Sequence, residues 1–149
     1  MLTIARGVKK NITAQMQAIA HSLASPEEKL RRMMIASLLS VHDAVNTTAH
    51  GVELVDEMLR PKIMQCGQEE REMQLDLLAE VIAEGVRRSD FSVVDGDARR
   101  AARHLILAMV SFYPPYMDPC HGRATCRREL EMRANGMLDF VFQGIRHRD

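Results

Sequence analysis

Apolar residues recur every three or four positions along nearly the whole of this 149-residue chain. The first run consists of Ile4, Val8, Ile12, Met16, Ile19 and Leu23. An α-helix has about 3.6 residues per turn, so this spacing places the apolar side chains on one helix face, whereas a strand would need them to alternate. The chain is therefore expected to form amphipathic helices that bury these faces against one another.

Capping and turn residues divide this pattern into six helical segments. Besides the first run, helices are expected over residues 26–45, 52–63, 68–88, 98–113 and 130–145. Ser25 and Glu28 have the spacing of a capping box around Pro26, and proline suits the first helical position. Asp95 or Asp97 is expected to cap the fifth segment. The predicted fold is all-α: a bundle of about six helices in one domain, residues 1–149.

Two segments interrupt the helical pattern. Pro61 lies inside the 52–63 segment and should kink or end that helix, because proline lacks the N–H that the helix needs. Residues 91–94, Phe-Ser-Val-Val, have the composition of a short strand, but no neighbouring segment offers a strand partner. We therefore expect a packed connector there.

Charge balance and cysteine content restrict the class of protein. The 20 Lys and Arg residues are matched by 20 Asp and Glu residues, so net charge gives no reason for nucleic-acid binding. Three cysteines argue against a disulfide framework and fit a reducing compartment. No run approaches the roughly 18 apolar residues of a membrane span, and the first residues lack the pattern of a secretory signal. The expected location is the cytoplasm, without membrane association.

Two histidines and an aspartate are the candidate groups for catalysis. His42, Asp43 and His50 could support acid–base chemistry, but no nucleophile, glycine-rich loop or carboxylate pair accompanies them. We expect no enzymatic activity, no catalytic residue and no cofactor.

One cluster carries metal-ligand side chains: Cys120, His121 and Cys126. It lacks the regular cysteine spacing of a zinc site and a visible fourth ligand, although His104 could approach from another helix. A surface loop with ordinary thiols is the preferred interpretation, and a metal or redox sensor is the weaker alternative. No metal is expected.

Methionine is unusually frequent, with 11 residues and no tryptophan. Its flexible thioether fills irregular cores and also lines adaptable binding surfaces, so both interpretations stay open. The second interpretation predicts an apolar cavity between helices, with His42 and Tyr113 as its polar contacts. The residues expected to line it are Met33, Leu38, His42, Met58, Met73, Leu77, Met109 and Tyr113.

The passage over residues 80–102 contains Gly85, Phe91 and Asp95 between two helical segments. It resembles the helix–glycine–connector–phenylalanine–aspartate–helix passage of TetR-type transcriptional regulators. Residues 111–115, Ser-Phe-Tyr-Pro-Pro, are similar to the end of the first dimerisation helix in that family. Residues 1–24, followed by Ser-Pro-Glu-Glu-Lys-Leu, resemble the linker helix that enters the family's regulatory domain. The resemblance covers the whole chain, through helix order more than through exact motifs.

This resemblance implies a regulatory domain of a repressor. A small apolar or amphipathic effector would bind between the helices and thereby control a separate helix-turn-helix domain. No helix-turn-helix pattern occurs in these 149 residues, so DNA binding is implied only for a domain that this sequence does not contain. Three explanations stay open: a truncated regulatory domain, a start codon assigned too late, or a protein that lacks the DNA-binding domain. The alternative is a standalone helical dimeric interaction protein without ligand or DNA-binding activity.

A homodimer through the last two long helices is the final expectation. Residues 105–113 are apolar nearly all round, and one core within a single chain would cover only one of their faces. Met132, Phe140 and Phe142 lie off the apolar line of the last helix and also need cover. The predicted interface residues are Leu107, Val110, Leu130, Met137 and Val141.

Overall fold

Five α-helices account for most of the chain that the computed structural model describes, namely residues 2–47, 51, 53–54, 68–113 and 124–148. They are α1 (Leu2–Ala20), α2 (Pro26–Thr47), α5 (Gln68–Arg87), α6 (Ala98–Met109) and α7 (Ala124–Ile145), with 3₁₀ turns η1 (Val94–Gly96) and η2 (Val110–Phe112). No strand occurs in these ranges, so the predicted all-α class is confirmed for them. The helix predicted over 52–63 lies mostly outside the described residues.

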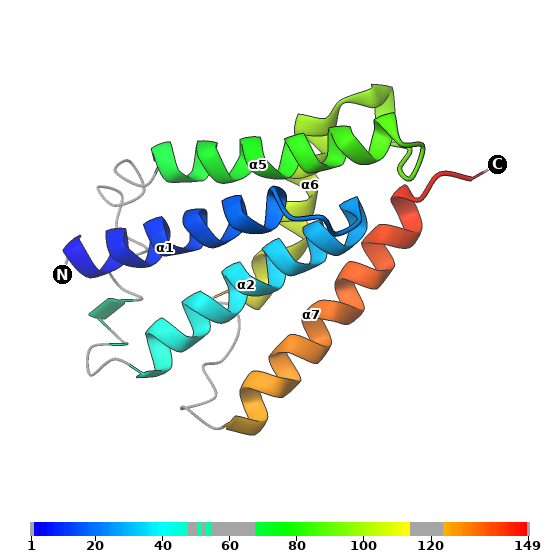
Figure 1. Cartoon of the computed structure of the whole chain (residues 1–149). Coiled ribbons are helices and arrows are strands. Elements are labelled where there is room, and N and C mark those ends of the chain that lie inside the picture. The colour runs from blue at the N-terminus through cyan, green and yellow to red at the C-terminus, as the bar shows by residue number, and fades with distance from the viewer. Residues whose placement is uncertain (1, 48–50, 52, 55–67, 114–123, 149) are drawn as a thin grey trace.

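Helix α2 occupies the centre of the bundle. It contacts α1, α5 and α7, while α5 also contacts α1 and α6, and α6 contacts α7. Figure 1 shows α1 between α5 and α2, α7 beside α2, and α6 crossing behind them. Within the described part of the chain, none of the helices is long and apolar enough to cross a membrane.

The apolar helix faces meet in one continuous core. Its largest fully buried side chains are Met16, Leu30, Met33, Leu38, Leu78, Val81, Ile82, Met109, Leu138 and Phe142. They come from all five helices, so each helix contributes to the same core rather than to a separate one. Burial of these apolar side chains is the main favourable contribution to folding.

Both predicted helix caps are confirmed. The backbone N–H of Glu28 donates to Oγ of Ser25 (3.3 Å), which satisfies one of the unpaired donors at the start of α2. At the start of α6, the backbone N–H of Arg100 donates to Oδ1 of Asp97 (3.0 Å). Asp97 is therefore the cap, whereas Asp95 lies inside η1 with a φ of 57°.

The end of the first helix differs from the prediction. Helix α1 ends at Ala20, and Leu23, which the periodicity placed on its apolar face, is 105% exposed. The chain leaves the helix in a turn in which the N–H of Ser22 donates to the carbonyl of Ile19 (3.1 Å). The helical spacing no longer determines where a side chain points once the helix has ended.

The last two helices also have different bounds from those expected. Helix α6 ends at Met109 and continues as the 3₁₀ turn η2, whereas the sequence pattern predicted one helix up to Tyr113. Helix α7 begins at Ala124 rather than near Leu130. Its first turns are held to α2 by Arg127, whose guanidinium donates to both carboxylate oxygens of Asp43 (2.9 and 3.2 Å). This long-range contact has no signature in the local sequence.

The segment after α5 is a packed connector, as predicted. Its Phe91 ring is buried directly over Gly85, so closely that a Cβ at that position would overlap the ring. The N–H groups of Asp90 and Phe91 both donate to the carbonyl of Gly85 (2.8 and 3.1 Å). The connector also pairs with the end of α7, where the N–H of Ser92 donates to the carbonyl of Ile145 (2.7 Å).

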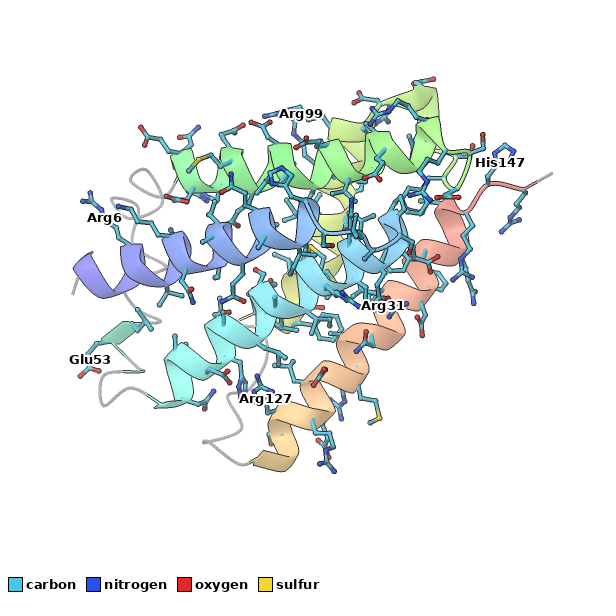
Figure 2. The ribbon with its side chains drawn as sticks, viewed as in Figure 1. Arg6, Arg31, Glu53, Arg99, Arg127 and His147 are labelled. Atoms are coloured by element: carbon cyan, nitrogen blue, oxygen red, sulfur yellow. The ribbon has the colours of Figure 1, made fainter. Side chains whose placement is uncertain are left out.

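Ion pairs along α2 and α7 fix the register of these two helices. Glu27 near the start of α2 pairs with Arg146 (2.5 Å), and Asp43 near its end pairs with Arg127 (2.9 Å). Between them the Arg31 guanidinium donates to the side-chain oxygen of Asn135 (2.8 Å). Figure 2 shows Arg31 and Arg127 in the space between α2 and α7. The helices are therefore antiparallel.

We predict that Gly85→Ala lowers the free energy of unfolding by about 1–3 kcal/mol, because the added methyl group must displace the buried Phe91 ring. Gly7→Ala is the matched control. Gly7 lies within α1, and an added Cβ there meets nothing within 4 Å. Alanine in a helix is favoured over glycine by roughly 0.5–1 kcal/mol, so this control should stabilise the protein. Urea unfolding followed by circular dichroism measures both values, and equal stabilisation by the two variants would contradict the packing described.

Candidate ligand-binding site

A groove of about 550 Å³ runs between α1, α2, α5 and α6. Its walls are mostly apolar, and it opens to solvent on one side. The apolar and hydroxyl-bearing residues that line it are Ile12, Met16, Met34, Ser37, Val41, Leu75, Leu78, Ile106, Leu107, Val110 and Tyr113. Helix α6 packs against α5, and its side chains that face α1 are not fully covered. The groove is the space left between them.

A pair of hydroxyl groups lies in the wall of the groove. The phenol of Tyr113 donates to Oγ of Ser37 on α2 (2.9 Å). Burial raises the pKa of Tyr113 from 10.0 to about 12, because the phenolate would lose its hydration, and the Ser37 hydrogen bond offsets part of this rise. The phenol is therefore neutral at physiological pH and serves as a hydrogen-bonding group.

Charged side chains surround the apolar part of the groove. Lys9 comes from α1, Arg71 and Glu72 from α5, and Arg103 from α6. The Glu72 carboxylate is paired with the guanidinium of Arg99 (2.5 Å). Arg99 also pairs with Asp76, and this hydrogen bond is the main reason that its pKa is raised. Figure 2 shows Arg99 on the outer side of α5.

A buried hydroxyl group connects α1 with α5 beside the groove. Thr13 donates to the carboxylate of Glu70 (2.6 Å) and accepts from Nε2 of Gln74 (3.1 Å). Gln74 itself lines the groove. The wall formed by α1 is therefore held in place both by apolar contacts and by this polar network.

The predicted ligand residues are distributed differently from the expectation. Of the eight, Tyr113 lines the groove, and Met58 lies outside the described residues. Met33, Leu38 and Met109 are fully buried in the core, because their helix faces are covered by neighbouring helices and leave no space beside them. Met73 is 45% exposed on the outer side of α5, and Leu77 is half-buried against the core. The groove is lined instead by Met34 and Ser37 of α2, which are the sequence neighbours of Met33 and Leu38.

His42 lies at another place, on the side of α2 that faces α7. Its Nδ1 is 3.4 Å from Oδ1 of Asp43, and its buried Nε2 has no hydrogen-bond partner among the described residues. The hydrogen bond from Arg127 holds the pKa of Asp43 below its usual range. His42 does not line the groove, so the structure does not bring it together with Tyr113 as the predicted second polar contact.

The predicted dimer residues also divide into two groups. Leu107 and Val110 are exposed and line the groove. On α7, Leu130 is buried in the core of its own chain, while Met137 and Val141 are half-buried against it. Met132 and Phe140 on the same helix are exposed, at 66% and 75%, whereas Phe142, which was expected to need cover as they do, is fully buried in the core of its own chain. Among the helices expected to form the dimer, exposed apolar side chains thus lie on α6, on the following turn η2 and on the Met132–Phe140 side of α7.

The cysteine–histidine cluster is only partly described. Cys126 lies in the first turn of α7 rather than in a loop, and Cys120 and His121 lie outside the described residues. In the described ranges, no three His, Cys, Asp or Glu side chains come close enough together to hold a metal ion.

Sequence reasoning missed most of the residues around the groove. Ser37 was the available signal, since a hydroxyl side chain on the inward face of an apolar helix needs a polar partner. Comparison of the chain with protein-family models, with curated proteins and with solved structures finds no match in any of the three. The geometry of the groove therefore carries the functional argument.

We predict that Tyr113 remains un-ionised at pH values where an ordinary tyrosine is half ionised. The chain has two tyrosines, so a Tyr116→Phe background leaves Tyr113 as the sole chromophore for absorbance titration. The pKa of Tyr113 is raised to about 12 in the folded protein, against 10.0 for an ordinary tyrosine. Its contribution to the free energy of unfolding is therefore complete below pH 10.0 and is lost as the pH rises through about 12. Half ionisation of the folded protein near pH 10.0 would contradict the burial of the phenol.

Proposed function

We propose that this chain is a ligand-binding and dimerisation domain like those of TetR-type regulators. In this proposal a small apolar or amphipathic molecule occupies the groove and controls DNA binding by a separate helix-turn-helix domain. The groove is the observation that carries the proposal, since its volume of about 550 Å³ suits a small molecule. Small-molecule sites typically measure about 300–1,000 Å³ and combine apolar walls with a few polar groups.

The position of α1 supplies a route from the ligand to a DNA-binding domain. Ile12 and Met16 of α1 line the groove, so a bound molecule would contact this helix directly. In the resemblance to TetR-type regulators, α1 corresponds to the linker helix. A ligand shifts the equilibrium between two orientations of α1 only if it binds them with different affinities. In this proposal, contact between the ligand and α1 is the source of that difference in affinity.

Binding of Nile red, a neutral apolar dye, tests the groove. Val110→Trp should weaken binding at least about tenfold, because the larger ring occupies the space of the ligand, and tenfold corresponds to about 1.4 kcal/mol. Val110 is exposed, so the substitution does not overpack the core. Leu23→Trp is the matched control, since Leu23 is exposed and lies outside the groove. Fluorescence titration measures both affinities.

The outcome of that titration also separates the two classes of function. In a standalone interaction protein without a ligand, Nile red would bind only to exposed apolar surface such as the Met132–Phe140 stripe, and Val110→Trp should then change nothing. Equal loss of binding in Val110→Trp and Leu23→Trp would place the dye outside the groove and contradict the proposal.

The same proposal includes a homodimer formed through α6 and α7. Leu107 on α6 is 64% exposed, and Met132 and Phe140 on α7 carry further apolar surface to the outside. Met132, Gly136 and Phe140 follow one another at intervals of four residues, so they form one stripe along α7. A second copy of the chain would cover this stripe around a two-fold axis. Leu107 also lines the groove, so the ligand would lie beside the proposed interface.

We predict that Phe140→Glu converts the dimer into a monomer, because a charged side chain would be buried without a partner at the centre of the interface. Leu23→Glu removes an exposed apolar side chain from the turn between α1 and α2, which belongs to neither interface helix, and should leave the dimer intact. Sedimentation equilibrium measures the mass of each. A monomeric mass for the unmodified chain at tens of micromolar would contradict the dimer, since permanent interfaces bury about 2,000 Å² or more.

A further inference from the structure

The charges at the groove come from three helices and are mainly positive. Lys9 of α1, Arg71 of α5 and Arg103 of α6 are the three basic lining residues, against the single carboxylate of Glu72. Glu72 is already paired with Arg99, which lies outside the groove. The lining residues from α2 are Met34, Ser37 and Val41, none of which is charged. Glu70 lies near α1 but accepts the hydrogen bond of Thr13.

Among these basic groups, Arg103 is the clearest candidate for contact with a ligand. It is exposed on α6, and no ion pair or hydrogen bond joins its side chain to another residue in the described part of the chain. The apolar lining residues Ile106 and Leu107 follow it by three and four positions on the same helix, and this spacing places all three side chains on one face of α6. An arginine in this position presents several N–H donors to a molecule whose apolar part lies in the groove.

We propose that the groove selects an amphipathic anion: an extended apolar chain that ends in a carboxylate. This inference rests on the proposed ligand-binding function. The apolar chain lies against Met34, Leu75 and Leu78, and the carboxylate lies at the rim beside Arg103. Hydrogen bonds between a guanidinium and a carboxylate are stronger than those between neutral groups, so the anion gains over a neutral molecule of the same length.

A cationic ligand is disfavoured by the same charges. It would lie close to the guanidinium of Arg103, while the Glu72 carboxylate is already paired with Arg99.

The test uses displacement of Nile red from the full chain by dodecanoate, dodecanol and dodecyltrimethylammonium, each below its micelle-forming concentration. Dodecanoate should bind roughly fivefold more tightly than dodecanol, because one exposed ion pair contributes up to about 1 kcal/mol. The ammonium compound should bind most weakly. Added salt should reduce the advantage of the carboxylate, since it screens exposed charges.

Arg103→Gln should remove most of the preference for dodecanoate and leave the affinity for dodecanol unchanged. Arg133→Gln is the matched control, because Arg133 is an exposed arginine on α7 that does not line the groove. Equal affinities for dodecanoate and dodecanol, or an unchanged ratio in Arg103→Gln, would overturn the anion preference while leaving an apolar binding site in place. Absence of Nile red binding in the unmodified chain would instead overturn the proposed function and this inference together.

Discussion

The position of α2 is the constraint on which the rest of the fold depends. This helix contacts α1, α5 and α7, and Leu30, Met33 and Leu38 are almost completely buried among them. Polar contacts then fix how the neighbouring helices lie. Lys29 is 7% exposed and pairs with Glu84 of α5 (3.1 Å), so loss of the Glu84 carboxylate would leave the Lys29 charge buried without this partner. The ion pairs to α7 set the register on the other side.

The groove follows from this arrangement of helices. Because α5 packs against both α1 and α6, it separates them at one end of the bundle, and apolar side chains from both helices face the intervening space. Apolar surface of this kind is normally covered in a monomeric protein unless it serves binding. The groove and the exposed stripe of α7 are therefore the surfaces on which the two proposals rest, and Leu107 of α6, which lines the groove, takes part in both.

Local sequence signals predicted the elements better than they predicted the site. The caps at Ser25 and Asp97 and the connector at Phe91 depend on residues within a few positions of each other, so they could be recognised in the sequence. The groove depends on contacts between residues far apart, such as the hydrogen bond between Tyr113 and Ser37 (2.9 Å). Helical periodicity identified the inward face of α2 but did not distinguish Met33, which is enclosed by neighbours, from Met34, which borders the groove.

The sequence by itself determined the all-α class, most of the helices and the apolar faces that they bury, because periodicity and capping act within a few turns of one chain segment. Only the tertiary structure decided the pairing of Arg127 on α7 with Asp43 on α2, and which apolar side chains line the groove instead of packing against a neighbouring helix. Both depend on the relative placement of whole helices. That placement is set by the packing of many distant side chains at once, and a one-dimensional pattern does not encode it position by position.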